Sequence, residues 1–316
     1  MPRQPDVPAG ALASLVRRAF GPSVAVRWER TPDGVSTRVY RLFRGAETFY
    51  VRIAEEADQN LETDAELHGR LRGLGVRVPE VVFVEPFDPA LGRSVAITTE
   101  VPGTSLARAS CPPAVARIVA EQAGEDLAVI NRVTVGGFGW VRRRGRGWPL
   151  HAEHTDHERF LTSYLPVDWP GALASLLSGS VLTAVEEVLD EERAHPPAAA
   201  RLAHGDFDTT AIFCSDGRYT GIIDFGEIRG AEPAFDLGHF HLHDEERMPA
   251  RLLPALLAGH GRVALPPDEP SIRRSAVLSG LRQLCRWLDR GWGPGHPAVL
   301  SRAARIAELA RPVVSE

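Results

Sequence analysis

The spacing of apolar residues changes at Pro102-Gly103, and this change divides the chain into two parts. Before this point, short segments alternate apolar and polar residues, as half-buried strands do. We expect five strands, with one helix (Gln59–Gly75) after the third, at Ser23–Glu29, Arg38–Phe43, Thr48–Ile53, Val81–Val84 and Ser94–Thr98. The first part therefore predicts a five-stranded antiparallel sheet that carries one helix.

Beyond Pro102-Gly103 the apolar residues follow a helical period. A capping box, Thr155 with Glu158, marks the start of the second of these helices. The helices are expected at Ala114–Asn131, Thr155–Leu165, Ala172–Arg193, Met248–Gly259, Pro270–Arg290 and Ala298–Ala310. The whole pattern predicts an α+β fold, with an N-terminal unit over residues 1–101 and a mainly helical C-terminal unit over residues 102–316.

Composition and charge exclude several classes of protein. The formal net charge is −5, whereas binding to a nucleic-acid backbone needs a basic face, so no nucleic-acid partner is expected. No window approaches 18 uncharged apolar residues, and the first residues lack the apolar core of a signal peptide, so we expect no membrane partner. Three scattered cysteines without a C-x-x-C pair fit a reducing cytoplasm. Nothing in the sequence predicts an oligomeric state.

The chain contains no lysine, so all 36 basic residues other than histidine are arginines. A GC-rich genome is the simplest explanation. Whatever the cause, any role that enzymes usually give to lysine must fall to arginine here.

Two aspartates flank a predicted β-hairpin. The strands Ala211–Cys214 and Tyr219–Ile223 are joined by a Ser-Asp-Gly turn, with Asp206 before the first strand and Asp224 directly after the second. A hairpin returns its two ends to one place, so the carboxylates should converge. Such a pair suits a proton acceptor beside a ligand of a divalent metal, because Mg²⁺ prefers carboxylate and phosphate oxygens.

This segment resembles the signature of the aminoglycoside phosphotransferases, which are relatives of the protein kinases. The similarity lies in His204-Gly205-Asp206 and in the I-I-D-F-G-E run that contains Asp224. It extends to Arg229–His239, with Asp236 at the family's aspartate. Ser94–Leu106 looks like the family's hinge strand. Glu125–Trp140 is similar to a further family stretch, although Asn131 replaces the usual histidine there. The resemblance implies a protein-kinase-like bilobal fold, ATP or GTP as phosphate donor, Mg²⁺, and a small hydroxylated substrate that is an antibiotic or a metabolite.

The resemblance also implies roles for individual residues. Asp206 would be the catalytic aspartate that accepts or orients the acceptor hydroxyl, and Asp224 would bind the metal. Arg52 stands where these kinases place a phosphate-anchoring base on the third strand. Its partner on the helix is expected to be Asp64, with Glu62 and Glu66 as alternatives.

Other nucleotide contacts are expected from backbone groups. Gly34, Ser36 and Thr37 lie in the turn between the first two strands, where their N–H groups and hydroxyls would cover the phosphates. Thr99 and Val101 would offer hinge backbone groups to a purine. The resemblance places the acceptor pocket in the helical region, where the sequence carries no motif.

The chain departs from the family at Ala211, where an asparagine usually provides a second metal ligand. Asp208 or Thr210 could take over this role, or the site could work with one metal. The third alternative is a pseudokinase that binds a nucleotide or another ligand without transfer.

His239, His241 and His243 alternate, which on a strand would place them on one face as a metal site. The resemblance predicts a helix here, so a metal site is not expected.

Overall fold

The computed structural model describes residues 5–31, 38–144 and 147–311. The described residues form two compact units. The first comprises those of Met1–Gly103, Arg142–Leu150 and Thr220–Ile223, and the second comprises those of Thr104–Val141, His151–Tyr219 and Asp224–Glu316. The two later segments of the first unit were not anticipated by a single boundary after residue 101.

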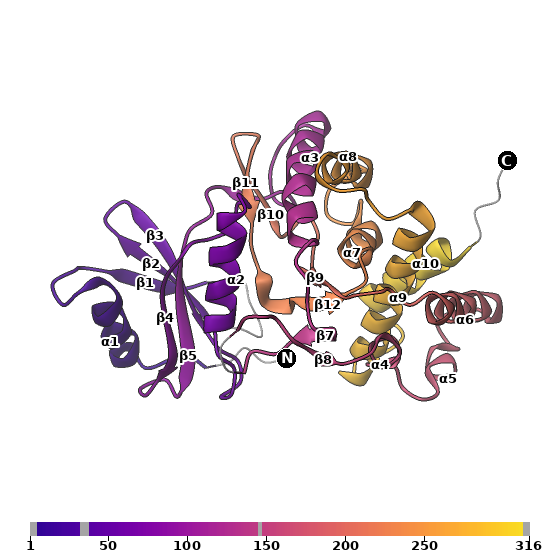
Figure 1. Ribbon diagram of the computed structural model, residues 1–316, viewed down its shortest axis with the longest axis horizontal. Helices are drawn as coiled ribbons and strands as arrows, with labels where there is room; N and C mark the ends of the chain where they lie inside the picture. Colours follow the sequence, from indigo (N-terminus) through magenta and orange to yellow (C-terminus); the bar gives the residue numbers. More distant parts are fainter. Residues whose placement is uncertain (1–4, 32–37, 145–146, 312–316) are drawn as a thin grey trace. The chain divides into compact units, whose positions relative to one another are not determined.

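The first unit contains the predicted five-stranded antiparallel sheet (Figure 1). Its strands have the order β1-β2-β3-β5-β4, with bounds β1 Arg27–Arg30, β2 Arg38–Arg44, β3 Glu47–Ile53, β4 Val81–Asp88 and β5 Arg93–Thr99. On β3, Phe49, Val51 and Ile53 are buried, whereas Arg52 points to the other face and pairs in register with Val39 and Ala96. This alternation is the period-2 pattern from which the strands were predicted.

Helix α1 (Ala9–Phe20) was missed by the sequence analysis. It buries Leu12, Leu15 and Val16 in the same apolar cluster as the sheet residues Leu42 and Phe49. Its short apolar run ends in two arginines, Arg17 and Arg18. These arginines occupy the last turn of the helix, where cations are favourable.

The predicted helix after the third strand is α2 (Glu62–Gly73). Leu67 and Leu71 are fully buried on it, as the helical period required. Asp64 and His68 are buried as well, at 6% and 7% exposure, so this helix carries a charged side chain into the protein interior. Such a carboxylate needs a charged partner.

The second unit holds the remaining helices (Figure 1). They are α3 Pro113–Ile130, α4 His157–Thr162, α5 Trp169–Leu173, α6 Gly179–Ala194, α7 Phe235–His243, α8 Leu253–Val263, α9 Glu269–Asp289 and α10 Pro297–Ala310. The single helix expected over Ala172–Arg193 is wrong, because Ser178 caps a new helix at α6 by accepting a bond from Val181 N. The expected cap at Thr155 is also wrong, since Asp156 caps α4 instead.

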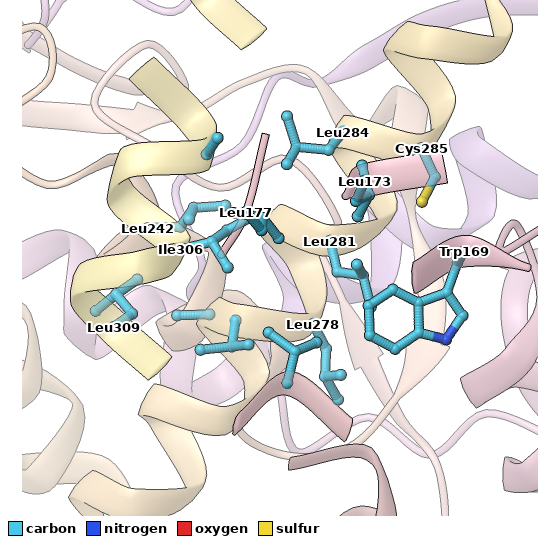
Figure 2. Close-up of a cluster of buried hydrophobic side chains, with 14 of the residues drawn as sticks. Trp169, Leu173, Leu177, Leu242, Leu278, Leu281, Leu284, Cys285, Ile306 and Leu309 are labelled. Carbon is cyan, nitrogen blue, oxygen red and sulfur yellow. The ribbon is translucent and has the colours of Figure 1, made fainter. Parts of the chain in front are cut away.

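Helix α9 contributes to an apolar cluster of buried side chains in this unit (Figure 2). Leu278, Leu281 and Leu284 of α9 are buried, and they share the cluster with side chains from α5, α7 and α10. No helix in the described part of the chain is long and apolar enough to cross a membrane.

Two small sheets adjoin the segments that carry Asp206 and Asp224. The expected hairpin is present as β10 (Ile212–Ser215) and β11 (Arg218–Ile222), with β6 (Thr104–Ser105) beside β10. The other sheet has the order β8-β7-β12-β9, with bounds β7 Phe138–Val141, β8 Ala152–His154, β9 Arg201–Ala203 and β12 Arg229–Ala231. The loop with Asp206 leaves β9, and the turn with Asp224 leads into β12, so this sheet fixes one end of each.

Helices α3 and α8 pack closely through two glycines. A Cβ atom on Gly259 would overlap the carbonyl oxygen of Glu121, and one on Gly124 would overlap that of Leu256.

Replacing Gly259 with alanine should therefore lower the free energy of unfolding by about 2 kcal/mol, measured by urea denaturation. The control is Gly261→Ala on the same helix, where the nearest atom lies at 3.9 Å, and it should stabilise by up to about 1 kcal/mol. Equal effects of the two substitutions would contradict this packing.

Candidate active site

Asp236 holds the loop that carries Asp206. Its Oδ2 accepts hydrogen bonds from His204 N and from Asn131 Nδ2, both at 2.8 Å, and its Oδ1 accepts one from Gly205 N at 2.9 Å. Asp236 is only 1% exposed. A buried carboxylate with three donors is well satisfied and fixes the backbone directly before Asp206.

The loop and the turn after β11 pack directly against each other. The buried ring of His204 lies 4.8 Å from the ring of Phe225, edge to face, which indicates that this histidine supports the loop. Gly205 has φ +91°, and a Cβ there would overlap the carbonyl oxygen of Glu227. Buried Arg229 donates to that same carbonyl at 3.1 Å and to the Glu227 carboxylate at 2.9 Å. The structure therefore brings together the two segments that carry the aspartates.

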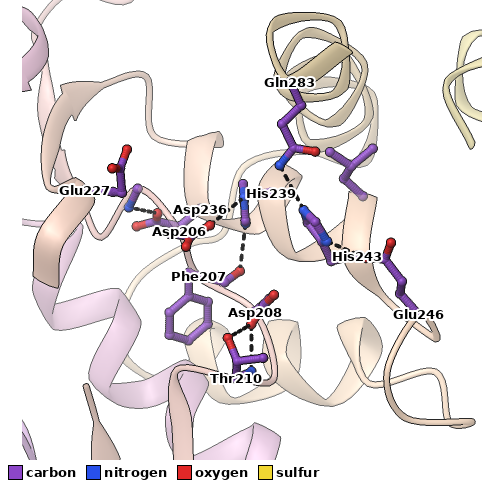
Figure 3. A network of polar contacts seen from close by, with 12 residues as sticks. Asp206, Phe207, Asp208, Thr210, Glu227, Asp236, His239, His243, Glu246 and Gln283 are labelled. Atoms are coloured by element: carbon purple, nitrogen blue, oxygen red, sulfur yellow. Dashed lines mark hydrogen bonds and ion pairs between the residues drawn. The ribbon is translucent and has the colours of Figure 1, made fainter. Parts of the chain in front are cut away.

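Asp206 contacts a histidine that the sequence analysis did not assign to the site (Figure 3). Its side chain is 55% exposed, and its Oδ1 lies 3.3 Å from Nε2 of His239, which comes from α7. Nδ1 of the same ring lies 3.2 Å from the carbonyl oxygen of Phe207. Partial desolvation by the surrounding protein acts to raise the pKa of Asp206, but the adjacent basic groups, His239 foremost, hold that pKa below its usual range.

The ring of His239 is itself buried and lies 4.6 Å from the ring of His243. Burial, helped by His243, lowers the pKa of His239 to about 4, so the ring is neutral at neutral pH. The helix expected over these histidines is confirmed as α7. His239 and His243 lie close together on this helix because positions four apart share a helix face.

Asp208 has a different setting from Asp206. It is 6% exposed, and its Oδ1 accepts bonds from both the backbone N–H and the hydroxyl of Thr210 (Figure 3). Ala211 is 2% exposed and donates its N–H to the carbonyl oxygen of Asp208 at 3.1 Å. Asp208 and Thr210 therefore stabilise the turn of the loop. Oδ1 of Asp208 and the hydroxyl of Thr210 are hydrogen-bonded to each other.

Asp224 follows β11 and is exposed. Its backbone is left-handed, with φ 67° and ψ 57°, directly before the short 3₁₀ helix η1 (Phe225–Glu227). A non-glycine residue in this conformation is strained and is held there by its surroundings, here by the ring contact of Phe225 and the hydrogen bonds from Arg229 to Glu227. An exposed carboxylate on a rigid turn is suited to bind a cation.

In the first unit, Arg52 and Asp64 lie together. Arg52 Nη1 is 3.7 Å from Asp64 Oδ1. The alternatives Glu62 and Glu66 have other partners, since Glu62 accepts from the Asn60 amide and Glu66 pairs with Arg70.

Arg143 was not anticipated. Its guanidinium donates to both oxygens of Asp64, through Nε at 2.9 Å and Nη2 at 3.1 Å. Burial acts to raise the pKa of Asp64, but Arg143 and then Arg52 hold it below its usual range. The signal available in the sequence was the arginine-rich run that begins at Arg142.

Two groups of the expected hinge residue Thr99 already have hydrogen-bond partners within the protein. Thr99 donates its backbone N–H to the Glu80 carbonyl at 2.8 Å, and its hydroxyl accepts from Glu80 N at 3.0 Å. Both groups therefore join the end of β5 to the residue directly before β4. Val101 is buried. Gly34, Ser36 and Thr37 lie outside the described residues.

The chain is similar to known proteins in sequence and in fold. Residues 27–275 match the model of a phosphotransferase enzyme family. A hygromycin-B 4-O-kinase of Escherichia coli is 23% identical over 216 residues, which are 66% of this chain and 59% of that protein. This chain thus matches about three fifths of the length of its curated relative.

Solved structures share the fold. A thermostable mutant of aminoglycoside phosphotransferase APH(4)-Ia, in ternary complex with ADP and hygromycin B, superposes with a TM-score of 0.67 at 18% identity, covering 97% of this chain and 100% of that one. Another mutant of APH(4)-Ia, in complex with AMP-PNP and hygromycin B, gives a TM-score of 0.67 at 18% identity, covering 95% and 98%. The expected fold class is therefore confirmed.

Asp236→Asn tests the anchor of the loop. An amide has only one acceptor oxygen, so at least one of the donors on His204 N, Gly205 N and Asn131 loses its partner. The free energy of unfolding should fall by about 3 kcal/mol, measured by urea denaturation. Glu187→Gln, at an exposed position on α6, is the control and should change it by less than about 0.5 kcal/mol. A wild-type value for Asp236→Asn would contradict the anchor.

The pKa of His239 predicts a pH dependence of stability. The folded-state pKa of about 4 lies below the value of about 6.5 in an unfolded chain. As the pH falls from 6.5 to 4, only the unfolded chain takes up this proton, so the stability present above pH 6.5 is progressively lost. His239→Asn should flatten this part of the profile, measured by thermal denaturation at a series of pH values. An unchanged slope would show that the ring titrates alike in both states.

Proposed function

The chain belongs to the phosphotransferase enzyme family, and we propose that it transfers the γ-phosphoryl group of a nucleoside triphosphate to a hydroxyl of a small molecule. One observation carries this proposal. A rigid loop held by Asp236 presents the exposed carboxylate of Asp206, and this loop packs directly on the turn that presents Asp224. A proton acceptor beside a metal-binding carboxylate is what this transfer needs.

Each residue has a defined task in this proposal. Asp206 accepts the proton of the acceptor hydroxyl, or orients that hydroxyl, while the oxygen attacks the γ-phosphorus. The bond from the γ-phosphorus to the bridging oxygen of the β-phosphate breaks, and the nucleoside diphosphate leaves. His239 and the anchored backbone before Asp206 hold the carboxylate in place. Arg52 contacts phosphate oxygens with a planar set of donors, which suits a chain without lysine.

Magnesium fits the donor set of the second unit. Asp224 is an exposed oxygen ligand on a rigid turn, and it would hold the ion. The bound ion would neutralise charge on the phosphates. Ala211 offers no side-chain ligand, and Asp208 has one carboxylate oxygen engaged with Thr210, so Asp224 is the principal protein ligand in this proposal.

The proposed donor is ATP, and the proposed acceptor is a hydroxylated, amine-bearing antibiotic of the hygromycin type. The names of the relatives support both choices, since they include a hygromycin-B 4-O-kinase and complexes with ADP or AMP-PNP. In this proposal residues 1–101 bind the nucleotide and residues 102–316 provide catalysis and the acceptor pocket. The reaction would take place in the cytoplasm, where ATP is available.

A pseudokinase is the second candidate, and Ala211 favours it. The buried methyl group stands where the family resemblance expects a metal-binding amide, so a metal would lose one ligand. Such a protein would bind nucleotide or antibiotic without transfer.

Asp206→Asn separates these candidates. With ATP or GTP, Mg²⁺ and hygromycin B, the wild type should release phosphorylated product, detected by mass spectrometry. Asp206→Asn should slow the transfer by at least about a hundredfold, because the amide cannot accept the proton. Asp216→Asn, in the exposed turn of the β10–β11 hairpin, is the matched control and should keep the wild-type rate.

Two results would go against the proposal. If Asp206→Asn turned over as fast as the wild type, Asp206 would not be the proton acceptor. If the wild type bound ADP but gave no product with any hydroxylated acceptor above the rate without protein, the pseudokinase would be the better description.

A further inference from the structure

Asp64 lies between two guanidinium groups of the first unit. Both Asp64 and Arg143 are buried, with side chains 9% and 8% exposed, while the side chain of Arg52 is 28% exposed. One negative and two positive charges leave this group with a net positive charge. A salt bridge between Asp64 and Arg52 alone would have been neutral.

The two arginines share the carboxylate unequally. Arg143 donates to both oxygens of Asp64, from Nε to Oδ2 at 2.9 Å and from Nη2 to Oδ1 at 3.1 Å. Arg52 approaches no closer than 3.7 Å, which is beyond hydrogen-bonding distance. The carboxylate is therefore satisfied by Arg143, and the donors of Arg52 are not used by it.

The position of Arg143 does not depend on Asp64 alone. The described residues of Arg142–Leu150, which we call the return segment, have further contacts with α2 and with the residues directly before it. Asn60 N donates to the carbonyl oxygen of Arg143 at 2.6 Å, and the Arg70 guanidinium lies 4.0 Å from the centre of the Trp148 ring. Gly147 lies so close to Thr63 that a Cβ atom there would come within 2.5 Å of its Cα. These contacts hold Arg143 beside Asp64 before any ligand binds.

We propose that Arg143 is a positioning residue for nucleotide binding, which occupies both oxygens of Asp64 and so leaves the donors of Arg52 free for phosphate. This inference rests on the proposed function, in which Arg52 contacts the phosphates. Without Arg143, the buried carboxylate would be left with Arg52 as its cationic partner, and a guanidinium pairs with a carboxylate through two of its donors. A phosphate would then have to compete with Asp64 for the same donors.

The test is calorimetric titration of ADP with Mg²⁺ into the full-length chain, at a temperature where circular dichroism shows each variant folded. Arg143→Gln should weaken ADP binding about tenfold, because Asp64 then draws Arg52 away. Adding Asp64→Asn to Arg143→Gln removes the competing carboxylate, and the affinity should return to within about threefold of the wild type. If Arg143→Gln does not fold, Arg143→Lys is used, with a smaller loss and the same recovery.

Two controls isolate the effect. Arg52→Gln should weaken ADP binding, and adding Arg143→Gln to it should cause no further loss, because Arg143 acts through Arg52. Arg274→Gln breaks a comparable ion pair in the second unit, where Arg274 Nε lies 2.8 Å from Glu192 Oε1. It should lower the melting temperature while ADP binds with wild-type affinity.

The outcomes separate this inference from the proposed function. Wild-type affinity in Arg143→Gln, or no recovery when Asp64→Asn is added, would overturn the positioning role. A purely structural Arg143 would change the melting temperature in these variants and leave the affinity constant. Wild-type affinity in Arg52→Gln would instead overturn the phosphate contact of Arg52, and a wild type that does not bind ADP would overturn the proposed function itself.

Discussion

The hydrogen bonds to Asp236 are the constraint on which the second unit's chemistry depends. They connect α7 to the backbone before Asp206 and to the end of α3, three segments that lie far apart in the sequence. Because the carboxylate is buried, each bond is strong, and the loss of any acceptor would leave a donor without a partner. Asn131, which stands where the family resemblance places a histidine, donates its amide to both Asp236 and the Leu202 carbonyl.

Local pattern determined how much of this could be predicted from sequence. The sheet strands alternate apolar and polar residues, and the β10–β11 hairpin has a Ser-Asp-Gly turn, so both were predicted correctly. Helix α1 was missed because a single amphipathic stretch of three turns gives a weak signal without its sheet. The split between α5 and α6 was missed because Ser178 caps a helix inside a continuous apolar period.

In the candidate site, too, the residues within local motifs were predicted and the long-range contacts were not. Asp206, Asp224 and Arg52 each lie within a recognisable local motif. The contacts of Arg143 with Asp64 and of His239 with Asp206 join residues separated by 79 and 33 positions, and no local pattern reveals such pairs.

The return segment has a consequence for dissecting this protein. A fragment ending at Gly103 would contain the complete five-stranded sheet and α2, but it would lack both Arg142–Leu150 and Thr220–Ile223. Asp64 would then be buried without its bidentate partner, and the Arg77 carbonyl would lose the bond from Ile222 N. The nucleotide-binding half proposed here is consequently not an autonomous module, and domain exchange with a relative would have to transfer three separate stretches of chain together.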